Sequence, residues 1–256
     1  MSAPDRAPPA PADGAKVAQA GALLLLLLDG RAPSGAHSHS GGMEAAVSAG
    51  FVTDLAGVEA FCRGRLRTHG RVAAAFAAAA CQLWLGPGAG TGSASRLAPG
   101  PSWRDLDAEF SARTPSEAMR ASSRQLGRGL LRLLRAMLPA ADLTTPLAGC
   151  GAPAPHHPLV LGAGVALAGG DAALAARAAA LGVCTGPASA AVRLLGLDPY
   201  GVQGLLARLA PEIDDCGSLA VASAASEPQS LAADGAPALD LRADHHLTTE
   251  VRLFAS

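Results

Sequence analysis

The stretch LAGVEAFCRGRLRTHGRVAAAFAAAACQL, residues 55–83, decides the fold class of this chain. Its apolar side chains return every three or four residues, which is the spacing of one helical face. Thr53 or Asp54 is placed to cap the first turn. The pattern predicts one long helix, or two nearly collinear helices with a kink at Gly64 or Gly70. The face consists of Leu55, Val58, Cys62, Leu66, His69, Ala73, Phe76, Ala80 and Leu83.

Helical signals continue on the N-terminal side and after this segment. Residues 19–28 are apolar on every side, which predicts a short buried helix. Ser40 is placed to cap a second helix over residues 41–49. The run Thr114-Pro115-Ser116-Glu117 has the form of a capping box with proline at the first helical position. We expect the helix that it opens to end at Leu138, before a proline.

The C-terminal half repeats these signals. Gly186-Pro187 predicts a break or kink inside one helix, and a loop over 225–237 precedes a short helix near 238–246. No window alternates with a period of two residues, so no strand is expected. The prediction is an all-α, single-domain bundle of about eight to ten helices. The expected starts are His157-Pro158, Asp171, Asp198-Pro199 and Pro211.

Composition sets the domain organisation and excludes some partners. Residues 1–18 are rich in proline and alanine, which predicts a disordered tail before an all-α domain over 19–247 and a C-terminal tail over 248–256. Half of the 256 residues are apolar and the mean hydropathy is +0.27, which favours surface buried against partners. A net charge of −1 argues against a bulk electrostatic grip on nucleic acid.

Export and membrane insertion are not expected. The apolar run Ala22–Leu28 is at the lower limit for a secretory leader, and Asp29 follows it directly. The run Val72–Cys81 is too short to span a membrane. The five cysteines are odd in number and widely spaced, which is typical of small buried side chains in a reducing compartment. We therefore expect a cytoplasmic protein.

Histidines are the first candidates for a metal site. His37 and His39 lie in one loop, and imidazole suits nickel, copper and zinc. Two histidines are an incomplete ligand set, so packing or backbone hydrogen bonding in the loop is the competing interpretation. His156-His157 precedes a helix that it could cap or pack against, and His69 is expected to be a satisfied core or interface histidine.

Five arginines step along one predicted helix at intervals of three and four residues. The spacing predicts a stripe of guanidinium groups that either faces water or meets an acidic partner. Aromatic side chains for stacking on nucleic acid bases are scarce in this chain. The stripe consists of Arg120, Arg124, Arg128, Arg132 and Arg135.

Catalytic motifs are missing from the sequence. It contains no phosphate-binding G-x-x-x-x-G-K-[ST], no dinucleotide-binding G-x-G-x-x-G after a strand and no G-x-S-x-G nucleophile elbow. The glycine-rich run after Gly86 lacks the lysine and the strand of a phosphate cradle, so it is expected to be a linker. We therefore predict a protein that is not an enzyme.

Five segments, in order and spacing, resemble the UreF family of urease accessory proteins. The resemblance runs from about residue 20 to the end of the chain. The segments are SHSGGMEAA (38–46), SSRQLGRGLLRL (122–133), HHPLVLG (156–162), GPASAAVRLLGLDP (186–199) and EVRLFAS (250–256).

This resemblance implies an all-α, homodimeric cytoplasmic protein that works without catalysis of its own. Members associate with the UreD/UreH accessory protein, the GTPase UreG and the urease apoprotein to assemble the nickel metallocentre of urease. It implies no stably bound cofactor, with nickel at most in transit. The alternative that the residues leave open is a nickel carrier that uses its histidines.

The resemblance also assigns roles to individual residues. His37 and His39 stand where family members carry aromatic residues or a histidine, which favours packing over metal binding. Arg193 matches a basic position, although the Pro-Leu-Gly-Gln that follows it in the family is here Gly196-Leu197-Asp198-Pro199. The tail over 248–256 is expected to engage the UreD/UreH partner. The predicted partner-binding residues are Arg252, Leu253, Phe254, Arg193, Arg124, Arg128 and Glu44.

Overall fold

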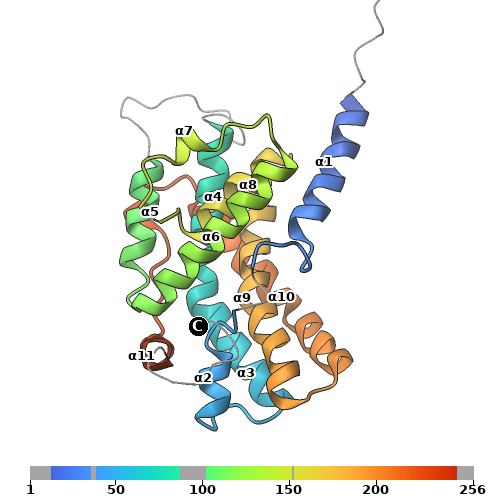
Figure 1. Ribbon diagram of the computed structural model, residues 1–256, viewed down its shortest axis with the longest axis vertical. Helices are drawn as coiled ribbons and strands as arrows, with labels where there is room; N and C mark the ends of the chain where they lie inside the picture. The colour runs from blue at the N-terminus through green and yellow to red at the C-terminus, as the bar shows by residue number, and fades with distance from the viewer. Residues whose placement is uncertain (1–12, 36–38, 87–101, 152, 247–256) are drawn as a thin grey trace, which may run out of the picture.

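The computed structural model describes residues 13–35, 39–86, 102–151 and 153–246. Across these ranges the chain forms ten α-helices of six or more residues and a single-turn helix, α7, and it forms no strand there. The predicted all-α class is confirmed. Figure 1 shows the helices packed into one bundle from which α1 projects.

The elements follow one another with short connections. A π-helical segment, η2 (Leu66–Gly70), joins α3 to α4, and a 3-10 turn, η3 (Pro228–Ser230), follows α10. The α-helices are α1 (Asp13–Leu28), α2 (Met43–Ser48), α3 (Leu55–Arg65), α4 (Arg71–Leu85), α5 (Trp103–Ala112), α6 (Glu117–Met137), α7 (Thr144–Leu147), α8 (His157–Leu167), α9 (Ala172–Leu195), α10 (Pro199–Ser223) and α11 (Pro237–His246).

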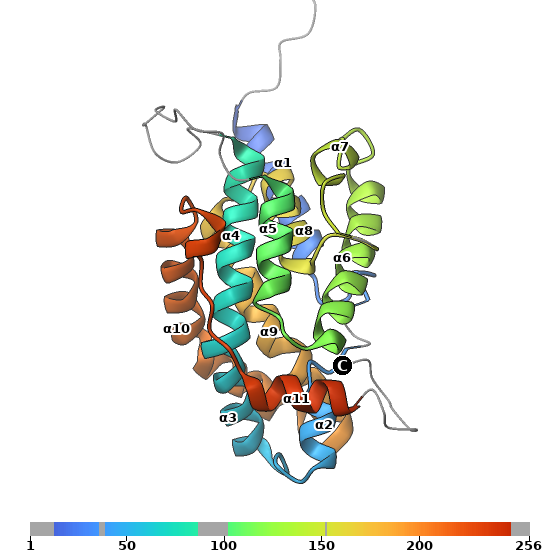
Figure 2. The same cartoon turned by 90° about the vertical axis from the view of Figure 1, so that its left-hand side faces the viewer.

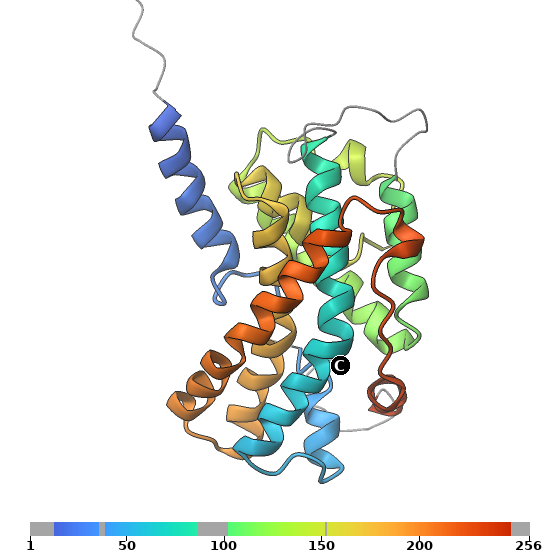
Figure 3. The same cartoon turned by 180° about the vertical axis from the view of Figure 1, so that it is seen from behind.

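The periodic segment that decided the fold class forms one rod through the molecule. Helix α3 starts where predicted, because the Asp54 carboxylate accepts a hydrogen bond from the backbone N–H of Gly57 at 2.8 Å. The chain widens into a π-helix over Leu66–Gly70 and continues as α4. Figure 3 shows α3 and α4 running together along the length of the bundle. A π-helical insertion of this kind often marks a functional site.

Small residues let the central helices approach closely. Every residue from Val72 to Cys81 is buried, because α8, α9 and α10 surround α4. A Cβ atom at Gly162 would lie 2.3 Å from the carbonyl oxygen of Ala77, so α8 crosses α4 where only glycine fits. Of the cysteines, Cys62, Cys81, Cys184 and Cys216 are buried and Cys150 is partly buried, and all five are free thiols.

Helix α9 is long and apolar enough to cross a membrane by composition alone. Its apolar character has another cause, because alanines on its inner face, including Ala176 and Ala180, are fully buried in the bundle. Packing against α4 and α10 therefore accounts for the buried alanines of this helix.

The predicted helix start at Pro211 is wrong, and of the two outcomes predicted at Gly186-Pro187 the break does not occur. Helix α9 runs through Pro187 to Leu195, and α10 runs through Pro211 rather than starting there. A proline removes one backbone hydrogen bond and strains its helix, but packing of the flanking turns outweighs this local cost. The acidic residues after Pro211 lie within α10, where Glu212 pairs with Arg63 at 2.7 Å.

The N-terminal helix differs from its prediction in position and burial. Helix α1 begins at Asp13, inside the segment assigned to a tail, while residues 1–12 of that segment lie outside the described residues. Leu27 is buried against α8, but Leu25 is 76% exposed and Leu26 is 59% exposed. The expectation of a fully buried helix is therefore wrong for this chain on its own, because only one side of α1 meets the bundle.

Three helix starts in the first half also differ from the sequence interpretation. The cap of α6 is Ser116, whose hydroxyl accepts from the N–H of Met119, so the helix starts two residues after the predicted proline position. Helix α2 starts at Met43 after a left-handed Gly42, not at residue 41. The sequence interpretation missed α5, which opens with a capping box between Ser102 and Asp105.

Candidate functional site

Three of the sequence segments that resemble one family meet where α2, α6 and α8 come together. His39 is buried just before α2, and its ring Nδ1 lies 2.7 Å from the Ser122 hydroxyl of α6. His157 opens α8 beside them, and burial, with a smaller effect of His39, lowers the pKa of His157 to about 4. Both imidazoles line one cavity. The loop histidine His39 is thus anchored by packing and by a hydroxyl.

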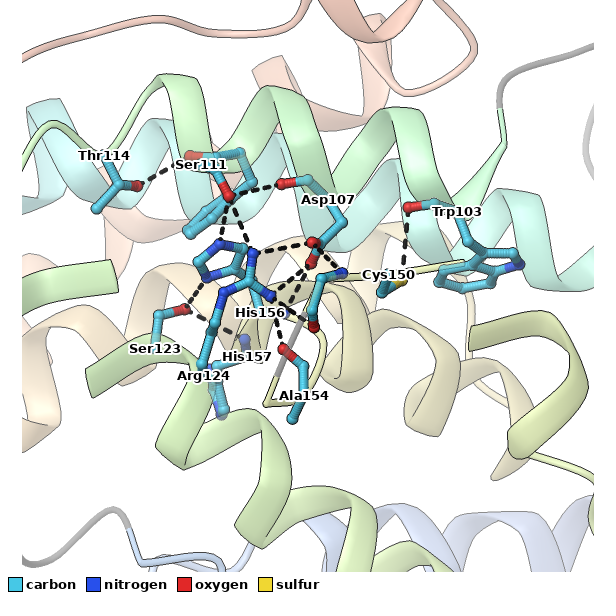
Figure 4. Close-up of polar contacts among 12 residues, drawn as sticks. Trp103, Asp107, Ser111, Thr114, Ser123, Arg124, Cys150, Ala154, His156 and His157 are labelled. Carbon is cyan, nitrogen blue, oxygen red and sulfur yellow. Dashed lines mark hydrogen bonds and ion pairs between the residues drawn. The ribbon is translucent and has the colours of Figure 1, made fainter. Parts of the chain in front are cut away.

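A second histidine lies under this junction in a closed hydrogen-bond network, shown in Figure 4. His156 has no exposed surface. Its Nε2 lies 2.8 Å from the Ser111 hydroxyl, and its Nδ1 lies 3.1 Å from the Ser123 hydroxyl. Ser123 also accepts from the backbone N–H of His157 at 3.2 Å. The consecutive serines of α6 therefore contact the ring of one histidine each, and Ser123 also contacts the backbone of His157.

One proton arrangement satisfies all the contacts of the His156 ring. In it, Ser111 donates its single hydroxyl proton to the carbonyl oxygen of Asp107 at 3.0 Å, and Nε2–H of His156 donates to Ser111 at 2.8 Å. Nδ1 is then the acceptor from Ser123. Burial, aided by the positive charge of Arg124, lowers the pKa of His156 to about 4 and keeps the ring neutral. The ring bridges two helices and is closed to a substrate.

Asp107 and Arg124 form the charged part of this network. Their ion pair measures 3.0 Å, and the two side chains are 4% and 14% exposed. Asp107 also accepts from the backbone N–H groups of Gly151 at 2.8 Å and His156 at 3.1 Å. Arg124 donates to the carbonyl oxygens of Gly151 and Ala154, at 3.1 and 2.6 Å. The pair fixes the segment that leads into α8 (Figure 4).

The predicted arginine stripe therefore needs a correction. Arg124 turns inward, because a carboxylate from another helix, Asp107, is close in space although distant in sequence. Arg120 donates to the carbonyl oxygens of Thr114 and Pro115, at 2.7 Å each. The remaining members, Arg128, Arg132 and Arg135, are exposed. A partner-binding role for Arg128 stays a prediction.

Two glycines of the family-like segment over residues 122–133, Gly127 and Gly129, have a structural role in α6. A Cβ atom at Gly127 would lie 2.1 Å from the carbonyl oxygen of Pro155, and one at Gly129 would lie 2.1 Å from that of Ser34. Both distances are impossible for real side chains, so α6 must present bare backbone to two loops. Gly127 and Gly129 therefore allow α6 to pass close to the loop that contains Pro155 and to the loop that contains Ser34.

A cavity opens beside this junction. It has a volume of about 380 Å³, and Arg65 and His69 of the π-helical region lie on its wall. Burial lowers the pKa of His69 to about 3, while its Nε2 lies 3.4 Å from a carboxylate oxygen of Asp240 in α11. Nδ1 of His69 has no hydrogen-bond partner among the described residues, so there the expectation of a satisfied histidine is wrong. Figure 2 shows α11 lying across the end of α6 beside α2.

The other predicted site residues fall into two groups. Glu44 is buried in the first turn of α2, and Arg193 is exposed in the last turn of α9, at the edge of the cavity. The partner-binding roles of Glu44 and Arg193 stay predictions, because their positions do not test those roles. His37 and the tail residues Arg252, Leu253 and Phe254 lie outside the described residues.

The chemistry available at the junction is that of packing and hydrogen bonding. Within the described ranges, no group of three or more histidine, cysteine or acidic side chains is arranged to hold a metal ion. The Ser111–His156 pair resembles a nucleophile and its base in distance only, since the ring is inaccessible. The sequence interpretation missed this pair and Asp107, because neither belongs to a recognisable local motif.

Comparisons with known proteins point in one direction. The UreF family model matches residues 52–210. Urease accessory protein UreF of Mycobacterium marinum is 41% identical over 235 residues, covering 92% of this chain and 98% of that protein. UreF of Mycolicibacterium vanbaalenii is 43% identical over 239 residues, with the same coverage. UreF of Mycobacterium tuberculosis strain H37Rv is 38% identical over 239 residues, again covering 92% and 98%.

Proposed function

Because the chain belongs to the UreF family of urease accessory proteins, we propose that it is a non-enzymatic scaffold for assembly of the urease nickel metallocentre. It acts with a UreD/UreH accessory protein, the GTPase UreG and the urease apoprotein, and it regulates the GTPase. The observation that carries the proposal is identity of 41–43% over more than nine-tenths of the chain. The protein is cytoplasmic and homodimeric in this proposal.

The surface of the bundle supports a scaffold. Leu25, Leu26 and Leu28 expose apolar side chains on α1, which projects from the bundle in Figures 1 and 3. Adjacent exposed leucines on one element are a feature of surfaces that associate with other proteins. They also agree with a positive mean hydropathy, which favours burial against partners. In the proposed complex these leucines are covered.

The buried polar network supports the same proposal. The histidines and serines that the family-like segments bring together are used to join helices, as the Ser123 contacts illustrate. A rigid junction keeps the surrounding surfaces in fixed relative positions, which a scaffold requires. UreG then supplies the nucleotide chemistry, which fits the absence of a phosphate-binding glycine motif from this sequence.

Co-purification tests the proposal directly. The full chain is co-expressed with a UreD/UreH protein and a UreG protein, beside a chain that lacks residues 251–256. We expect the full chain to retain both proteins and the shortened chain to lose the UreD/UreH protein, because Leu253 and Phe254 form an apolar anchor. Circular dichroism checks that both chains keep their helices. Failure of the full chain to retain either protein contradicts the scaffold, and undiminished retention by the shortened chain contradicts the role of the tail.

A nickel carrier is the second candidate function, favoured by the proximity of His39 and His157 on one cavity wall. Equilibrium dialysis of the purified chain against nickel separates the two functions. A scaffold binds no nickel stably, whereas a carrier binds it and loses it when His37→Phe and His39→Tyr are combined. We expect that double variant to fold and to support urease activation. A folded variant that assembles normally but leaves urease without nickel contradicts the packing role of these histidines.

A further inference from the structure

One buried arginine, Arg65, forms no ion pair with any described residue, unlike the arginines that are paired elsewhere in the bundle. Arg65 is the last residue of α3, directly before the π-helical segment, and its side chain is buried. Its Nε has no hydrogen-bond partner, and no ion pair joins its guanidinium to any residue in the described part of the chain. Its Nη2 lies beside Gly41, where a Cβ atom would be 3.4 Å away. The guanidinium reaches the cavity wall.

An unpaired buried guanidinium is costly. Arginine keeps its charge in proteins, and moving a charge out of water without a partner is strongly unfavourable. Burial lowers the pKa of Arg65, while the carboxyl group of Asp240 acts on it electrostatically without forming an ion pair. That carboxylate faces His69, and burial raises its own pKa. Among the residues that the structure describes, Arg65 is therefore a cation without a contacting counterion.

The cavity around this cation is apolar and of ligand size. Its volume of about 380 Å³ lies within the range of small-molecule sites, which typically combine apolar walls with few polar groups. Its apolar lining includes Val72, Phe110, Leu126 and Pro158. A second cation on the wall, Arg113, is already paired with Glu109. In the described part of the chain, the cavity thus offers the guanidinium of Arg65 to a ligand with an apolar body.

We propose that this cavity binds a small monocarboxylate, with the carboxylate on Arg65 and the apolar body against Val72, Leu126 and Pro158. A guanidinium pairs with a carboxylate through two parallel hydrogen bonds, so a singly charged ligand satisfies the unpaired group. A bare inorganic anion would leave the apolar walls uncovered. Among the described residues, the lining of the cavity includes none from α1, so the proposed site does not depend on the scaffold proposal.

Calorimetric titration of the full chain with chosen probes tests the site. The probes are acetate, butyrate, hexanoate and the neutral analogue hexanamide. We expect affinity to rise by about fourfold for each buried methylene along the carboxylate series, and hexanamide to bind at least tenfold more weakly than hexanoate. Absence of hexanoate binding, or equal binding of hexanamide, overturns the proposal and leaves a water-filled cavity.

Variants locate the binding. Arg65→Met is expected to weaken hexanoate at least tenfold, and Arg65→Lys to weaken it less. Arg67→Met is the matched control, since Arg67 lies two residues away, is exposed and pairs with Glu212. If Arg65→Met loses its helical circular dichroism, Leu126→Trp narrows the cavity instead and is expected to exclude hexanoate. Unchanged hexanoate affinity in a folded Arg65→Met or Leu126→Trp variant overturns the proposal.

Discussion

Two arginines inside this bundle, Arg124 and Arg65, differ in whether the rest of the chain supplies partners for their guanidinium groups. Arg124 pairs with Asp107 and donates to two carbonyl oxygens and a serine hydroxyl. Arg65 is at least as buried, yet its side chain makes no hydrogen bond or ion pair within the described ranges. The first region holds two helices and a loop in place. The second has a charge that the fold alone does not neutralise.

The difference shows how a buried charge indicates its role. A guanidinium whose donors are satisfied by its own chain stabilises the fold, because removing one partner leaves the other uncompensated. A guanidinium without partners reduces stability and persists in the fold for another reason, such as a ligand. The same residue type therefore has opposite effects at two sites less than one hundred residues apart.

The largest expected effect comes from breaking the satisfied region. Asp107→Asn should lower the free energy of unfolding by about 3–5 kcal/mol, since it leaves Arg124 buried without its anion. Urea denaturation measures this change. Asp214→Asn is the control, because Asp214 pairs with Arg177 at 2.9 Å on the exposed surface and should cost at most about 1 kcal/mol. Equal losses in the two variants would contradict the importance of burial.

The next effect concerns the backbone contact beside the same network. Gly127→Ala should lower the free energy of unfolding by about 2 kcal/mol or more, because the added methyl group meets the carbonyl oxygen of Pro155. Gly182→Ala in α9 is the control, since a Cβ atom there meets nothing within 4 Å. That variant should be neutral or more stable by up to about 1 kcal/mol. A Gly127→Ala chain as stable as the control would show that α6 can move away from the loop.

Replacing each arginine by methionine tests the comparison itself. Arg65→Met should leave the free energy of unfolding unchanged or raise it by about 1–2 kcal/mol, because it removes an unpaired charge. Arg124→Met should lower it, because it exposes Asp107 to the interior without a cation. Thermal and urea unfolding of the two variants compare the signs. A loss of stability in Arg65→Met as large as that in Arg124→Met would remove the distinction.

The smallest expected effect is a pH dependence from the satisfied region. The pKa of His156 is lowered to about 4 in the folded chain, below its ordinary value near 6.5. The unfolded chain therefore binds a proton first, and stability present above pH 6.5 falls as the pH drops toward 4. His156 should contribute about 1 kcal/mol of loss between pH 7 and pH 5.5. Urea denaturation across this range should show a shallower slope in His156→Gln, and an equal slope would contradict the assignment.

Local signals were sufficient for most helix starts. Asp54, Asp171 and Asp198 each cap a helix at the expected place, because a cap requires only a side chain and backbone N–H groups two or three residues ahead. Local signals failed at Pro211, which lies inside α10, and they did not exclude a helix that continues through Pro187, because packing of α9 and α10 outweighs the cost of proline. They also placed the start of α6 two residues early, because both Thr114 and Ser116 are acceptable caps.

The candidate site was only partly accessible from the sequence. His39 was selected as a loop histidine, but its contact with Ser122 joins residues 83 positions apart. Arg124 was assigned to an exposed stripe, because the helical spacing gives its face but not what covers that face. Nothing in the sequence indicated that Arg65 is buried without a partner, since an arginine in a helix is usually exposed.

The sequence by itself determined the all-α class, the long periodic rod, several caps and the family. These features depend on spacings within a few residues, or on an ordered set of segments, and both can be read along the chain. Only the tertiary structure decided which arginine is neutralised and which one faces a cavity. That outcome depends on where α5, α6 and the loop before α8 cross, and the distances between their polar atoms arise only when the helices pack.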